Sequence, residues 1–179
     1  MPQVSKAMND EQKAMVWTLA AVRLTARKAL QTAIKPDFPQ LKRLLTYVER
    51  FGENQHQVTE ERYLFRPIEK REPQLARTIA RFRRDHSAMK GYRIRLSEVL
   101  SYWEKGDPKA GPQAAIVAED YLRFCQRHAR GERQLPPVLR RVASEAEWAE
   151  ADRAFASIAD PLAAARTRRE RMAALEAFK

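Results

Sequence analysis

Cysteine, glycine and long apolar runs are all scarce in this chain of 179 residues. Its single cysteine, Cys125, excludes an internal disulfide framework. No apolar run approaches the roughly 20 residues that a transmembrane helix needs. The N-terminal residues 1–13 also lack the apolar core of a signal peptide. We therefore expect a cytoplasmic protein with no membrane partner.

Strand signals are equally sparse, because no alternating run of β-branched residues stands out and the five glycines are dispersed. Ala, Leu, Arg, Glu and Gln dominate instead, and these residues favour helix. Prolines and turn residues divide most of the chain into four long amphipathic segments: residues 9–34, 39–70, 73–105 and 112–135. Long helices with short connections predict an all-α fold, an up-down four-helix bundle.

A shorter helical segment is predicted from Ser144 to about Ile158, and a basic, alanine-rich tail follows it. Its position after the fourth long segment places it outside a four-helix core. We expect residues 1–143 to form the bundle and residues 144–179 to pack on it as a C-terminal helical extension.

The positive charge of the chain does not by itself identify a nucleic-acid-binding protein. The net charge is +11 and the isoelectric point is about 10.1, but basic residues are spread along the chain and mixed with acidic ones. The densest cluster, RFRRDH at residues 81–86, comes with no helix-turn-helix, zinc-finger or RNA-binding signature. A solvated basic surface is the simpler interpretation, and nucleic-acid binding stays an alternative.

Histidine is rare, yet two of the three histidines head an H-x-x-x-E pair: His56 with Glu60 and His128 with Glu132. A spacing of four residues puts both members of a pair on one helix face. His86 falls on the inward stripe of a third predicted helix. Buried carboxylates are costly unless they are paired or bind metal, and imidazole with carboxylate suits Fe, Mn or Zn. The pattern indicates a metal site.

Two further residues lie close to this predicted site in the sequence. Cys125 precedes His128 by less than one turn and could approach the metal as a ligand or redox thiol, although a core cysteine is the simpler interpretation. Tyr121, two turns before His128, could hydrogen-bond a ligand or equally be a core tyrosine. Lys90 follows His86 by one turn and should point outward, since a cation would repel metal.

Four stretches of the chain, taken in order, resemble motifs of the hemerythrin-like (HHE cation-binding) family. They are QHQVTEERYLF (55–65), RRDHSAM (83–89), RHARGERQLPP (127–137) and EWAEADRAFASIADPL (147–162). The resemblance implies a four-helix bundle that holds a non-haem, usually di-iron, centre. It implies metal ligands at these five positions: His56, Glu60, His86, His128 and Glu132.

The first predicted helix departs from the family pattern, which adds a histidine there. Between Gln12 and Lys35 there is no His, Cys, Asp or Glu. His86 and His128 are 42 residues apart, and the same interval before His56 reaches Ala14. With a turn of slack, the inward positions to consider are Ala14, Met15, Thr18 and Ala21. We expect one side of the centre to lack a ligand.

The resemblance implies a protein that binds one or two iron ions, with Mn or Zn as other candidates. It would sense, carry or react with O₂, NO or peroxide at a vacant coordination position, rather than turn over an organic substrate. The alternatives are a metal-free bundle that acts as a protein-interaction scaffold and, beyond it, a basic nucleic-acid-binding bundle. A homodimer is left open.

Overall fold

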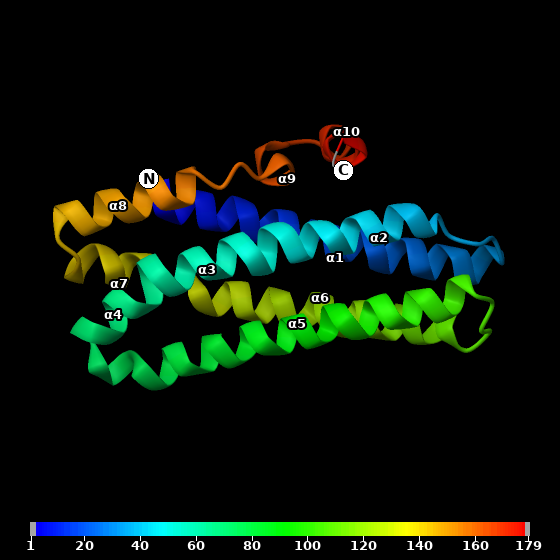
Figure 1. The fold of residues 1–179 in the computed structure, drawn as a ribbon, viewed down its shortest axis with the longest axis horizontal. Coiled ribbons are helices and arrows are strands. Elements are labelled where there is room, and N and C mark those ends of the chain that lie inside the picture. Colours follow the sequence, from blue (N-terminus) through cyan, green and yellow to red (C-terminus); the bar gives the residue numbers. More distant parts are fainter. Residues whose placement is uncertain (1–2, 178–179) are drawn as a thin grey trace.

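The computed structural model describes residues 3–177, and all regular structure within that range is helical. Four long helical runs lie side by side and alternate in direction (Figure 1). They are α1 (Gln3–Thr32), a composite second run over residues 38–71, α5 (Ala76–Glu104) and α6 (Ala110–Glu132). The predicted up-down bundle with an additional C-terminal helical segment is therefore confirmed. Residues 1, 2, 178 and 179, which belong to the two predicted units, lie outside the described residues.

The second run is one unbroken helical rod in which α-helical and π-helical segments alternate. Its segments are α2 (Phe38–Tyr47), η1 (Val48–His56), α3 (Gln57–Glu60), η2 (Glu61–Phe65) and α4 (Arg66–Arg71). Asp37 begins the rod, because its side chain accepts a hydrogen bond from the Gln40 amide at 2.9 Å. His56 and Glu60 each end a segment beside a change of helix type. Such π segments frequently occur at functional sites.

The fourth predicted helix ends close to its expected boundary, since α6 ends at Glu132 and a turn follows at residues 133–134. A separate helix that was not predicted, α7 (Leu135–Val142), begins there with Pro136 and Pro137 in its first turn. Proline is well accommodated in a first turn, where its missing amide hydrogen is not needed. The double proline therefore lies after the end of α6 and belongs to the first turn of α7.

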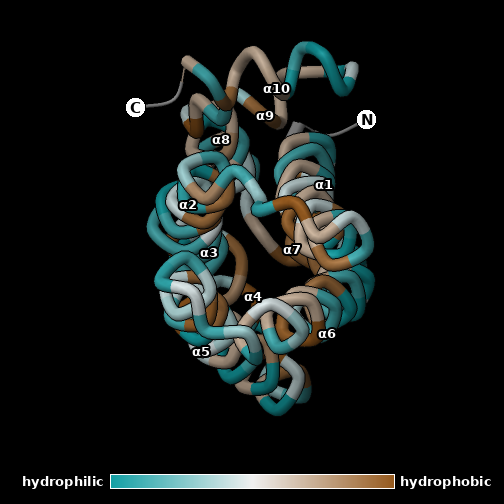
Figure 2. The backbone as a smooth tube through the Cα atoms, turned by 90° about the vertical axis from the view of Figure 1, so that its right-hand side faces the viewer, coloured by the Kyte–Doolittle hydropathy of each residue, from teal (hydrophilic) through white to brown (hydrophobic). Residues whose placement is uncertain are grey.

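The remaining helices lie together along one side of the bundle (Figures 1 and 2). They are α8 (Glu145–Ala156), α9 (Pro161–Ala164) and α10 (Arg168–Ala177). A short 3-10 helix, η3 (Pro73–Leu75), connects the second run to α5. A capping box begins α8, since Ser144 and Glu147 satisfy each other's backbone amides. Both α8 and α9 pack on α1. The division of the chain between residues 143 and 144 stays a proposal.

Two hydrophobic clusters form the core, and the predicted site residues contact both. One cluster includes Met89 and Cys125 among side chains of α1, α2, α5 and α6. The other includes Phe65 and Phe82 and extends to α7 and α8. The Phe65 ring stacks on His86 with centroids 5.5 Å apart. The histidine and glutamate side chains thus form a polar layer against apolar surroundings.

Length and hydropathy exclude a bilayer-crossing segment among the helices of residues 3–177.

Candidate metal centre

Four of the five predicted ligands converge at one point inside the bundle. One ligand atom from each of Glu60, His86, His128 and Glu132 can be chosen so that all lie within 4.8 Å of one another. Glu60 comes from the second run, His86 from α5, and His128 with Glu132 from α6. Metal–ligand bonds of about 2.0–2.2 Å bring the ligand atoms of one ion to such separations. The four side chains therefore fit a single cation.

The two imidazoles face each other and the carboxylates at this point. His86 Nε2 lies 3.1 Å from His128 Nε2 and 3.3 Å from Glu60 Oε2. Glu132 Oε1 is 3.0 Å from His128 Nε2 and 3.5 Å from His86 Nε2. Two nitrogens and two carboxylates thus point into the same small volume. Mixed nitrogen and oxygen donors of this kind suit Fe, Mn and Zn.

The carboxylate oxygens show most clearly that this group fits a cation. Glu60 and Glu132 are fully buried. Both oxygens of Glu60 and the Oε1 of Glu132 receive no well-aligned hydrogen bond within the described structure, and their polar neighbours are imidazole nitrogens. Buried polar atoms almost always have a partner, because an unsatisfied one costs about 1–3 kcal/mol. A bound cation would satisfy all three oxygens.

His56 lies beside this group, between the carboxylates of Glu60 and Glu11. Its Nε2 is 2.9 Å from Glu60 Oε1, and its Nδ1 is 2.5 Å from Glu11 Oε2. Burial alone would lower the pKa of His56, but Glu60 and Glu11 outweigh it and raise that pKa well above its ordinary value. The same contacts, with His86, hold the pKa of Glu60 below its ordinary value against the effect of burial. The sequence did not predict a role for Glu11, which lies one residue before the stretch from Gln12 to Lys35 that lacks acidic residues.

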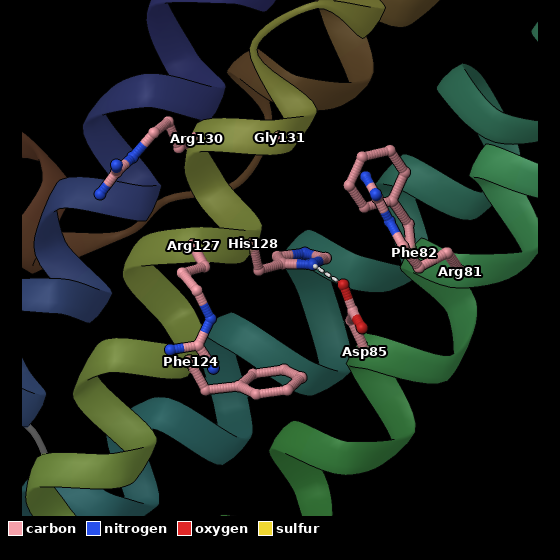
Figure 3. A pocket seen from close by; sticks show the side chains of 8 residues that line it. All are labelled: Arg81, Phe82, Asp85, Phe124, Arg127, His128, Arg130 and Gly131. Atoms are coloured by element: carbon pink, nitrogen blue, oxygen red, sulfur yellow. Dashed lines mark hydrogen bonds and ion pairs between the residues drawn. The ribbon is translucent and has the colours of Figure 1, made fainter.

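His128 is oriented from its outer edge by an acidic residue. Its Nδ1 lies 3.3 Å from Asp85 Oδ2, as the dashed line in Figure 3 marks. This contact favours the tautomer with Nδ1–H toward Asp85 and the Nε2 lone pair toward the centre. Asp85 lies at the edge of a surface groove between α5 and α6 that also contains Arg81 and Arg127. The sequence placed Asp85 in the RRDH motif and predicted no role for it.

Cys125 lies next to the centre without being one of the four converging ligands. It lines a small cavity together with His86, His128, Met15 and Met89. Burial raises the pKa of the Cys125 thiol far above its ordinary value, so the thiol is neutral and a poor metal ligand. This favours the core-cysteine interpretation, while its role beside the metal stays a prediction.

Tyr121 and Lys90 occupy very different environments. Tyr121 is fully buried, and its ring stacks on Tyr92 with centroids 5.5 Å apart. Its hydroxyl makes no hydrogen bond to any described residue, so its predicted hydrogen bond to a ligand stays a prediction without a supporting contact. The side chain of Lys90 is exposed, as expected for a cation beside a metal site.

Gln12, two positions before Ala14, is the α1 residue that hydrogen-bonds one of the four converging ligands. Its Nε2 donates to Glu132 Oε2 at 3.0 Å. Met15 lines the neighbouring cavity, whereas the Thr18 hydroxyl donates to the Ala14 carbonyl of its own helix. A fixed residue interval misplaces the position because π segments alter the register of the helix that carries His56.

Comparison with protein families agrees with the geometry. The chain matches the family model for the hemerythrin HHE cation binding domain over residues 3–139. A search of curated proteins returned no match. The matched region contains all five predicted ligands and the Glu11, Gln12 and Asp85 side chains that contact them. The chain belongs to the hemerythrin HHE cation-binding domain family.

Proposed function

We propose that this protein binds non-haem iron through the five predicted ligands, and that the iron senses, carries or reacts with O₂, NO or peroxide. One observation carries the proposal: three carboxylate oxygens of Glu60 and Glu132 are buried without a well-aligned hydrogen bond and face the imidazoles of His56, His86 and His128. The mixed nitrogen and oxygen set suits iron, and Mn or Zn are the competing metals.

The space beside the centre supports a very small ligand. The cavity lined by Met15, Met89 and Cys125 measures about 20 Å³. A space of about 10–15 Å³ on this measure holds one water molecule, so this cavity has room for a diatomic molecule. Iron, when bound, supplies the redox chemistry and the affinity for O₂ or NO, and the protein supplies a small, apolar approach to it.

Metal analysis tests the first half of the proposal. Protein expressed in iron-supplemented medium should retain iron after desalting. Glu60→Ala and Glu132→Ala should lose most of it, because each removes a buried carboxylate from the centre. Cys125→Ala is the matched control and should keep its iron. Retention of iron by the Glu60 variant, together with its loss from the Cys125 variant, would show that the ligand assignment is wrong.

Gas binding tests the second half. Addition of NO or O₂ to the anaerobic ferrous protein should change its visible absorption spectrum at a stoichiometry set by the iron content. The Glu132→Ala protein, treated identically, should show no such change. If O₂, NO and peroxide leave the spectrum of the iron-loaded wild-type protein unchanged, the function is limited to iron binding.

A metal-free scaffold remains the second candidate, and one contact favours it. Both ring nitrogens of His56 already lie against carboxylates, so this residue is satisfied without metal. A pure protein without metal, whose thermal stability is unchanged by chelator, would support the scaffold. Nucleic-acid binding would instead show as retention on DNA that falls steeply with salt. Cytoplasmic location and a homodimer stay predictions.

A further inference from the structure

Gln12 is a buried polar residue that connects α1 to the centre. Its side chain is 8% exposed and donates to Glu132 Oε2 across the bundle at 3.0 Å. The amide must present its NH₂ group to this carboxylate, since its carbonyl oxygen would be repelled there. The contact therefore has a defined direction: the Gln12 amide donates a hydrogen bond that Glu132 accepts.

The two buried glutamates consequently differ in how many oxygens are free for metal. Both oxygens of Glu60 have only imidazole neighbours and no well-aligned hydrogen bond: one lies 3.3 Å from His86 and the other 2.9 Å from His56. Glu132 has one such oxygen, because Gln12 occupies the second. A carboxylate bridges two ions with both of its oxygens. Glu132 can therefore serve one ion while Gln12 donates to it.

We propose that Gln12 restricts this centre to one tightly held metal ion, by keeping Glu132 a ligand through Oε1 alone. The inference rests on the proposed function. The retained ion has four protein ligands, which are the converging atoms of Glu60, His86, His128 and Glu132. A second ion, on the α1 side, would find His56 Nε2 and Glu60 Oε1 but no free oxygen of Glu132. Two ligands cannot compete with four, so that position is weak.

Replacement of Gln12 should change the number of metals. Wild-type protein, loaded with ferrous iron and passed over a chelating resin, should keep about one iron per chain. Gln12→His removes the donor, frees Glu132 Oε2 and adds an imidazole, so it should keep about two. Lys13→His is the matched control: the neighbouring side chain is 57% exposed and pairs with Asp10, so its iron content should stay at the wild-type value.

A second variant separates the donor from the added ligand. Gln12→Leu removes the hydrogen bond and frees Glu132 Oε2 without offering a ligand, so its iron count should rise above one but stay below that of Gln12→His. The first ion should bind about 10–100-fold more weakly, the usual effect of losing a hydrogen bond to a metal ligand. Competition with a chromogenic chelator measures this directly. Circular dichroism establishes whether each variant is folded. If Gln12→His is not folded, the iron count of Gln12→Leu still decides the question.

The outcomes separate the inference from the proposed function. Two tightly held irons in the wild type, or one iron in both wild type and folded Gln12→His, would overturn the inference and leave iron binding standing. One iron per chain in folded Gln12→Leu would also overturn it. No iron in the wild type or in any variant would overturn the proposed function and the inference together.

Discussion

At the scale of single residues, α1 supports the centre with two adjacent polar side chains. Glu11 contacts His56, and Gln12 contacts Glu132. Burial raises the pKa of Glu11 above its ordinary value, while its contact with His56 opposes that rise. The first helix therefore orients residues on two other helical runs instead of supplying a histidine. A ligand whose outer nitrogen is hydrogen-bonded keeps its ring orientation.

Neutralising Glu11 should loosen the centre. Glu11→Gln keeps the shape but removes the charge that faces His56 Nδ1, so His56 and its neighbour Glu60 should be held less firmly. We expect iron affinity to fall about 10-fold or more, measured by competition with a chelator. Glu98→Gln is the control, because Glu98 is exposed on α5. Equal affinities for the two variants would contradict an orienting role for Glu11.

A second buried contact extends from this region to the C-terminal segment. The Tyr47 hydroxyl donates to Asp160 Oδ2 at 2.7 Å. The other oxygen of Asp160 accepts from the amides of Leu162 and Ala163, which begin α9. Burial raises the pKa of Asp160, against the lowering effect of Tyr47 and these amides. One carboxylate thus joins the bundle to the helix that covers it.

At the scale of helical elements, the distance between α1 and η1 depends on a glycine. Gly52 lies in η1, and the sulfur of Met15 packs directly against its α-carbon, where a β-carbon would collide with it. Met15 is buried and also lines the cavity beside the centre. The close approach of these two elements therefore positions both the apolar cavity and the helix that carries His56.

Gly52→Ala should consequently destabilise the protein. The added methyl must displace the flexible end of the Met15 side chain, and overpacking of a core typically costs about 1–3 kcal/mol. The better helix propensity of alanine offsets about 1 kcal/mol of that cost. Urea denaturation at equilibrium measures the change. Gly91→Ala in α5 is the matched control, since a β-carbon there meets nothing within 4 Å. Alanine is the better helix former by about 1 kcal/mol, so the control should be neutral or stabilised. Loss of stability in both variants alike would argue against a specific contact with Met15.

At the scale of the whole molecule, the stability of the metal-free fold and the stabilisation added by metal should change with pH in opposite directions. Burial alone would lower the pKa of His86, but Glu132 and Glu60 outweigh it and raise that pKa to about 9. In the metal-free protein, this group stabilises the fold fully below its unfolded pKa of about 6.5. That contribution is lost as pH rises toward 9. Metal binding needs neutral imidazole and therefore strengthens over the same range.

Thermal denaturation at pH 6, 7.5 and 9 should show both of these trends. The midpoint of the metal-free protein should fall as pH rises, and the increase produced by ferrous iron under anaerobic conditions should grow. Iron at 100 times its dissociation constant adds about 2.7 kcal/mol, or about 5–10 °C for a chain of this size. His86→Gln should reduce this slope in the metal-free protein without abolishing it, because the pKa of His56 is also raised and contributes over the same range. An unchanged slope in this variant would show that His86 does not contribute to it.

Local sequence relations predicted much of this molecule. Apolar spacing placed the four long helical runs, and the H-x-x-x-E spacing put His56 with Glu60 and His128 with Glu132 on shared faces. These predictions succeeded because residues four apart in a helix are neighbours whatever surrounds them. The helix α7 was not predicted, because two consecutive prolines can end one helix or lie in the first turn of the next, and the sequence alone does not distinguish these roles.

The sequence by itself determined the fold class, the family and the side chains available for a metal. Tertiary structure decided which α1 residues meet them. Glu11 and Gln12 reach the centre, whereas the interval between histidines pointed to Ala14, because that choice depends on how α1 slides and rotates against its neighbours. Packing sets this register through contacts such as Met15 on Gly52, between residues far apart in the chain, and no local periodicity records it.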